Sequence, residues 1–243
     1  MKLNHKLLLT ILLIIILMCL SNMFFIQIDF TNDKRYSLSK TSLNEIKKID
    51  EPLIIDIFLT GNLPKAYLPF RNELDAILNH IKYYNNKIIL KYSDPLEYED
   101  SESINEEMLR FGLTPEIVVQ KKNGNREESI IFPWLILNYK GKSEKIRLLK
   151  KELGNTQNEN IYNSMQLLEN KIMDGIYRVS LRNKKNIAFL SSHGTTKKIK
   201  IADLLKNLKP YYNLSGFNLK NSKVTALQKL NDLMMFDLLI ISN

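Results

Sequence analysis

The sequence predicts an α/β protein with a hydrophobic N-terminus, and three observations support this prediction. Residues 7–28 form a long apolar run, and strand-like and helix-like segments then alternate from residue 53. From residue 186 the order is strand, helix, strand, helix, strand, which is typical of a parallel sheet. We therefore expect a tip and anchor in residues 1–28, one α/β domain in 29–150, and a linker helix with a partial parallel domain in 151–243.

The apolar run is long enough to cross a membrane. Residues 7–28 contain no charged residue, and these 22 residues would span roughly 33 Å as a helix. Lys2 and Lys6 precede the run without an acid, so the N-terminus is expected to stay in the cytoplasm while the rest crosses. A cleaved signal peptide would have an unusually long apolar region here, and no small-x-small site follows it. A lipoprotein would use Cys19, which follows an unfavourable Met18.

Composition excludes several classes of function. Cys19 is the only cysteine and lies inside the predicted span, so we expect no disulfide, no cysteine metal site and no cysteine nucleophile. The formal net charge is +9, but the lysines are scattered among Asn and Ile, and an exported domain meets no nucleic acid. No nucleic-acid partner is therefore expected.

The segments of the first domain follow the order of a thioredoxin-like fold. A capping box at Ser42–Glu45 predicts a first helix, and Asn123-Gly124 predicts a hairpin between residues 114–120 and 126–132. The other predicted elements are a strand over 53–59, a helix over 67–84, a strand over 87–93, a helix from 103 to Gly112, and a second hairpin over 135–149. A cis-proline precedes the third strand of thioredoxin folds, and Pro115 holds that place. No cysteine follows the first strand, so a scaffold for binding is expected rather than redox chemistry.

The last third of the chain predicts a helix and then a parallel sheet. After a polar linker over 154–159, apolar residues recur at helical spacing from about 158 to 182, and we expect this helix to pack across the domain junction. Strands at 186–190, 213–219 and 236–242 with helices at 199–208 and 225–233 then suggest the start of a flavodoxin-like or amidotransferase-like domain. Three strands leave an outer edge open, which indicates a fragment or a domain completed by another chain.

The turn after the strand at 186–190 is the candidate ligand-binding loop. It consists of Ser191, Ser192, His193, Gly194 and Thr195, and in open α/β sheets such a loop is the usual place for a ligand. Two other interpretations stay open: a structural turn with Gly194 in a permissive conformation and a Ser or Thr helix cap, or a hydrolase that uses Ser192 and His193. Neither a G-x-S-x-G elbow nor an identifiable orienting carboxylate supports the hydrolase. The three histidines lack metal-ligand spacing, so no metal or cofactor is expected.

A series of short motifs resembles the GldG family. The motifs are Arg35–Ser39 with Thr41, Gly61–Pro64, Asp94-Pro95, Ile131–Trp134, Asn138–Gly141, Leu167–Glu169 and Asn186–Leu190, and they occur in the expected order along nearly the whole chain. GldG proteins are accessory components of ABC transporters linked to bacterial gliding motility. Many relatives carry a Gly-His-Gly-Glu-like turn after the last motif, and this chain keeps His193 and Gly194 there.

The resemblance implies a single-pass protein of the bacterial inner membrane whose bulk faces the periplasm. Its partners would be a separate ATPase and permease, with membrane lipid contacted through residues 7–28 and Arg35 and Tyr36 as candidate partner-binding residues. Family members are longer and have a second membrane helix, which this sequence lacks. No ATPase phosphate-binding motif occurs, and no enzymatic activity is expected. The alternatives are a membrane-tethered Ser/His hydrolase or a non-functional fragment of the transporter subunit.

Overall fold

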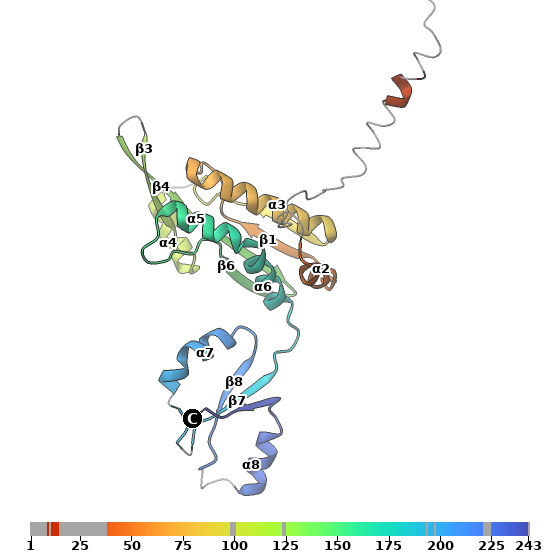
Figure 1. The fold of residues 1–243 in the computed structure, drawn as a ribbon, viewed down its shortest axis with the longest axis vertical. Helices are drawn as coiled ribbons and strands as arrows, with labels where there is room; N and C mark the ends of the chain where they lie inside the picture. The colour runs from red at the N-terminus through yellow and green to blue at the C-terminus, as the bar shows by residue number, and fades with distance from the viewer. Residues whose placement is uncertain are drawn as a thin grey trace, which may run out of the picture. The chain divides into compact units, whose positions relative to one another are not determined.

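The structure is a computed structural model that describes residues 9, 11–14, 38–97, 101–122, 125–192, 194–196, 198–220 and 225–242 (Figure 1). The chain divides into two units, residues 1–37 and residues 38–243. In the first unit only residues 9 and 11–14 are described, and they are helical. Most of the expected anchor therefore lies outside the described residues, and among those that are described no helix is both long and apolar enough to cross a membrane.

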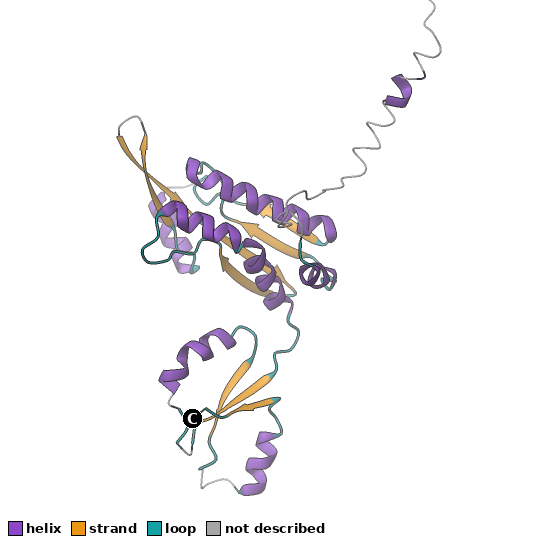
Figure 2. Cartoon of the chain, in the orientation of Figure 1, coloured by secondary structure: helices purple, strands orange, loops and turns teal. Residues whose placement is uncertain are grey.

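The second unit contains a four-stranded mixed sheet in the order β2-β1-β5-β6 (Figure 2). Its strands are β1 (Leu53–Ile57), β2 (Ile88–Tyr92), β5 (Trp134–Tyr139) and β6 (Lys142–Arg147). β1 pairs with β2 in parallel and with β5 antiparallel, and β5 pairs antiparallel with β6. The mixed α/β class predicted from the sequence is thereby confirmed.

Helices cover both faces of this sheet. α3 (Leu68–Tyr84), α5 (Gln157–Gln166) and α6 (Leu168–Ser180) contribute to the same core cluster as the inward side chains of β1 and β5. α2 (Lys40–Lys47) adds Ile46 to that cluster. Side chains of α4 (Ser101–Arg110) belong to a second cluster with Phe58, Trp134 and Ile136, which alternate with the first set along β1 and β5. One face of the central strands is thus fully buried, and the face toward α4 is partly buried.

Two predicted helix boundaries differ from the structure. α2 begins at Lys40 and is capped by Ser39, whose Oγ accepts a hydrogen bond from the Ser42 amide at 3.1 Å. The predicted capping box at Ser42 is wrong, because the Ser42 hydroxyl instead donates to Glu169 on α6 at 2.6 Å. The helix predicted over 158–182 is two helices separated at Leu167, and both pack on the first sheet. The first strand of the second sheet, β7, begins at Asn186.

The hairpin of β3 (Glu116–Lys122) and β4 (Asn125–Ile131) forms its own two-stranded sheet. Only one of its faces is covered, since Val118 is buried whereas Ile117 and Val119 are exposed. The third strand of the main sheet is instead β5, which buries alternate residues on one face and is preceded by Pro133. The place predicted for Pro115 is therefore wrong, and the described residues contain no cis peptide bond.

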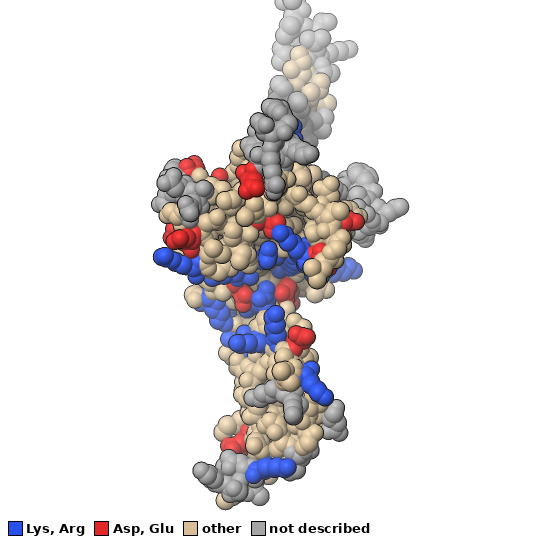
Figure 3. Space-filling view, turned by 90° about the vertical axis from the view of Figure 1, so that its left-hand side faces the viewer, with Lys and Arg blue, Asp and Glu red and all other residues tan. Residues whose placement is uncertain are grey.

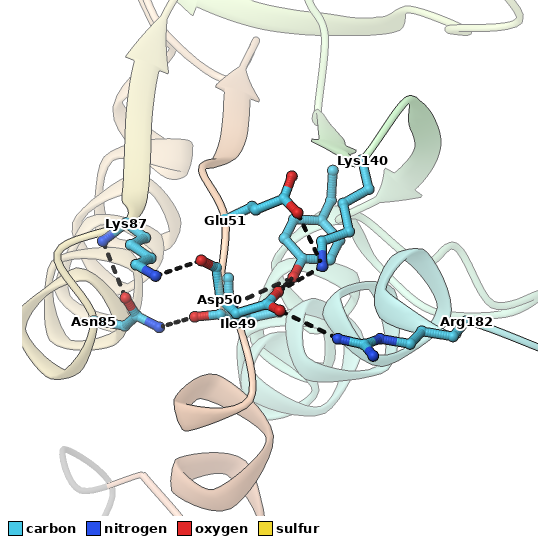
Figure 4. A network of polar contacts seen from close by, with 8 residues as sticks. Ile49, Asp50, Glu51, Asn85, Lys87, Lys140 and Arg182 are labelled. Atoms are coloured by element: carbon cyan, nitrogen blue, oxygen red, sulfur yellow. Dashed lines mark hydrogen bonds and ion pairs between the residues drawn. The ribbon is translucent and has the colours of Figure 1, made fainter.

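Asp50 is the centre of a polar network where α2 leads into β1 (Figure 4). Its carboxylate accepts a hydrogen bond from the Tyr139 hydroxyl at 2.5 Å and forms ion pairs with Lys140 at 2.7 Å and Arg182 at 3.2 Å. Lys140 also pairs with Glu51 at 3.2 Å. The hydrogen bond with Lys140, followed by that from Tyr139, holds the pKa of Asp50 well below its usual range. The network joins the start of β1, the β5–β6 turn and the residues that follow α6.

A second sheet consists of three parallel strands in the order β8-β7-β9. The strands are β7 (Asn186–Leu190), β8 (Asn213–Phe217) and β9 (Leu238–Ile240), and they are connected through η2 (Lys198–Ile201) with α7 (Ala202–Leu208) and through α8 (Ala226–Leu233). The predicted parallel sheet is confirmed. Its core is small, with Ala188, Leu190 and Phe217 as the buried members, whereas Leu230 and Met234 stay more than half exposed.

Gly175 allows α6 to pack directly on β6. A Cβ at this position would lie 2.1 Å from Cδ1 of Ile146, so Gly175→Ala should lower the free energy of unfolding by about 1–3 kcal/mol. Helix propensity alone would favour the alanine by about 1 kcal/mol, so destabilisation would identify the clash as dominant.

Ile146→Val provides the matched test in urea denaturation, because it removes the Cδ1 atom. The alanine should cost at least about 0.5 kcal/mol less in the Ile146→Val background than in the native one. Strictly additive effects would contradict this description of the α6–β6 contact.

Candidate functional site

The turn after β7 lies at the carboxyl end of the central strand of the second sheet. The chain passes from β7 through α7 to β8 on one side of β7, and from β8 through α8 to β9 on the other. This reversal of strand order is where parallel α/β sheets usually bind ligands. The turn contacts both neighbours: the Ser191 amide donates to the Phe217 carbonyl at 2.8 Å and the Thr196 amide donates to the Ser242 carbonyl at 2.9 Å.

The hydroxyl groups of the predicted loop residues make different hydrogen bonds. Ser191 is exposed and its Oγ donates to the Phe217 carbonyl at 3.0 Å. Ser192 is 8% exposed and its Oγ accepts a hydrogen bond from the Leu219 amide at 3.1 Å. The Thr195 hydroxyl donates to the Leu190 carbonyl at 2.9 Å. The hydroxyls of this turn therefore hold it to strand ends.

Gly194 adopts a φ of +80°, which fits the prediction of a permissive backbone at this position. α7 begins at Ala202, and its N-cap residue Ile201 makes no side-chain cap bond. The helical segment starts earlier, with η2 at Lys198, and Lys197 before it lies outside the described residues. His193, Arg35 and Tyr36 lie outside the described residues.

A cavity of about 840 Å³ lies beside this turn, lined by α7 and the strands β7 and β8. Ser191, Thr195 and Thr196 line the end where the strands finish, so the structure brings Ser191 and Thr195 to one site while Ser192 is absent from the lining. Lys184, Lys206 and Lys209 line the end where the strands begin, and apolar residues such as Phe189, Leu205 and Leu214 lie between. Sequence reasoning missed these lysines, although Lys206 and Lys209 stand three residues apart at the end of α7.

Comparison with known proteins assigns no activity to this site. Residues 32–138 match a family described as a domain of unknown function (DUF7088). No curated protein and no solved structure matches the chain. The matched residues run from before α2 into β5, so the turn and its cavity lie outside them.

A second cavity, of about 420 Å³, lies in the first domain. Its lining includes Tyr67 and Glu116, which are both buried, and the Glu116 carboxylate pairs with Lys151 at 2.6 Å. Burial, followed by the nearby charge of Glu116, raises the pKa of Tyr67 to about 12, so its hydroxyl keeps its proton at neutral pH. Within the described part of the chain, no group of three or more His, Cys, Asp or Glu residues is placed to hold a metal ion.

The buried hydroxyl of Ser192 should matter for structure. Ser192→Ala removes the acceptor of the Leu219 amide, so we expect faster hydrogen exchange at Leu219 and a loss of about 1 kcal/mol of stability. Ser191→Ala is the matched control, because the Phe217 carbonyl keeps the hydrogen bond from the Ser191 amide.

A larger loss of stability in Ser191→Ala than in Ser192→Ala would contradict the structural role of the Ser192 hydroxyl. A serine-reactive fluorophosphonate serves as a second measurement, and it should leave the folded protein unlabelled because Ser192 is buried. Labelling at Ser192 that depends on His193 would instead favour the hydrolase.

Proposed function

We propose that this protein is a membrane-anchored accessory subunit of an ABC transporter associated with gliding motility. In this role it binds substrate or partner non-covalently, while separate chains hydrolyse ATP and form the translocation path. Residues 7–28 would anchor it in the bacterial inner membrane with its bulk in the periplasm. The basis is the ordered series of motifs that resembles the GldG family.

The observation that carries this proposal is that the motifs contact one another. Ser39 in the first motif donates its amide to Glu169 in another motif at 3.1 Å, across 130 positions of sequence. At Gly61, which follows β1, an added Cβ would lie 1.9 Å from Oδ2 of Asp94, which follows β2. Residues that resemble a family in sequence therefore also meet at structural junctions, as expected when they maintain a shared fold.

The first domain supports a thioredoxin-like scaffold within this proposal. Two parallel strands are followed by two antiparallel strands in the order β2-β1-β5-β6, with α3 and α6 on one face and α4 on the other. The β3–β4 hairpin is an insertion before the third strand of that arrangement. The segment Gly61–Pro64 occupies the place after the first strand and contains no cysteine, which favours a binding role over a redox role.

The second domain supports non-covalent binding. Its turn presents backbone and hydroxyl groups beside a cavity, while the Ser192 hydroxyl is directed to the Leu219 amide. Arg35 and Tyr36, close to the predicted anchor, remain the proposed contacts with the permease.

Purification of the tagged full chain from mild-detergent membranes tests the proposal. We expect an ABC ATPase and a multi-span permease to be recovered with it in comparable amounts. The double substitution Arg35→Ala/Tyr36→Ala should reduce their recovery several-fold, whereas Lys34→Ala is the neighbouring control and should not. Recovery of the chain alone as a stable folded protein, or mainly as proteolysed material, would contradict an accessory role.

A further inference from the structure

The positive charge of this protein is concentrated in its second sheet domain. Residues 29–182 contain 23 Lys and Arg and 23 Asp and Glu, whereas residues 183–243 contain ten Lys and three Asp. On the face drawn in Figure 3, basic and acidic side chains are interspersed over the part that contains the first sheet. The charge excess therefore belongs to the domain that contains the candidate cavity.

Three of these lysines line one end of the cavity. Lys184 lies two residues before β7, and its Nζ donates to the Lys209 carbonyl at the end of α7 at 3.2 Å. Lys206 lies in the last turn of α7 and Lys209 is its C-cap residue, and all three lysines are exposed. The cavity lining contains no Asp or Glu among the described residues. This end of the cavity thus offers ammonium groups without a compensating carboxylate.

Between the lysines and the polar turn, the cavity has several apolar side chains in its lining. Its lining follows β8 from Asn213 to Gly216, a length of about 10 Å at roughly 3.3 Å per residue. Phe189, Leu205 and Leu214 supply apolar walls, and no described side chain of α7 is buried, so the helix does not fill this space. The volume of about 840 Å³ lies in the usual range for small-molecule sites.

We propose that this cavity binds a single-chain amphipathic anion. Its apolar chain would lie along Phe189, Leu205 and Leu214, and its carboxylate or phosphate would lie at Lys184, Lys206 and Lys209. The inference rests on the proposed non-covalent binding function and names the class of ligand for that site. A neutral or cationic ligand of the same length lacks the charge complementarity that the three lysines provide.

Photo-crosslinking locates such a ligand on the protein. The full chain in nanodiscs of zwitterionic phospholipid is labelled with dodecanoate that carries a diazirine at its chain end, and labelled peptides are identified by mass spectrometry. Label is expected on peptides of β7, α7 and β8, which line the cavity. Unlabelled dodecanoate or dodecyl phosphate should compete at least tenfold better than dodecanol, and the stronger of the two identifies the head group.

Two charge-matched variants test the role of the lysines. Lys206→Gln/Lys209→Gln should weaken labelling by about five- to tenfold, since each exposed ammonium contributes only a modest attraction. Lys185→Gln/Lys220→Gln removes the same net charge at exposed positions outside the lining and should leave labelling unchanged.

Equal competition by dodecanol, equal loss in both double variants, or label outside β7, α7 and β8 would overturn the proposal. A labelled chain that recovers no ATPase and no permease would remove the transporter role and keep this site. Recovery of both partners without cavity labelling would keep the transporter role and remove this site.

Discussion

Burial of β1 and β5 between two layers of helices is the constraint on which the rest of the first domain depends. Leu53, Ile55 and Ile57 of β1 and Leu135 and Leu137 of β5 are completely buried. Each such side chain contributes roughly 1.5–3 kcal/mol relative to an exposed one. Because these strands are covered on both faces, α3, α4 and α6 have fixed places, and the loops after β1 and β2 meet at Gly61 and Asp94.

The second domain is less tightly packed than the first. β7 is well buried, but α7 has no buried side chain among those described, and Leu230 and Met234 on and after α8 are more than half exposed. Regions with few buried apolar contacts open at lower free energy than a packed core, and ligand-binding elements are commonly drawn from them. The cavity between α7 and the sheet is a consequence of this loose packing, and the lysines at its end give it a preference for anions.

Much of the fold was predictable because its signals are local. Continuous or alternating apolar residues indicated strands such as β1, β5 and β7, and Asn123-Gly124 correctly indicated the hairpin of β3 and β4. The mistakes arose where tertiary contacts decide between local options. Ser39 and Ser42 are both able to cap α2, and the contact of Ser42 with Glu169 selects Ser39.

The candidate site was predictable only in part. The turn over residues 191–195 stood out because polar residues follow a buried strand, and the structure places Ser191 and Thr195 at a cavity. The basic end of the cavity was not predictable, because Lys184 and Lys209 are 25 positions apart and meet only after β7, α7 and β8 have folded. The place predicted for Pro115 was wrong for a related reason, since no local pattern shows that the β3–β4 hairpin stays outside the main sheet.

Hydrogen–deuterium exchange of the full chain, alone and in the proposed complex with an ATPase and a permease, tests most directly the claim that a rigid scaffold carries a binding domain ordered by what it binds. The account predicts slow exchange in β1 and β5 in both samples, and fast exchange in α7 and β9 that slows at least tenfold in the complex. Exchange in α7 and β9 that is already as slow as in β1 for the chain alone, and unchanged in the complex, would contradict it.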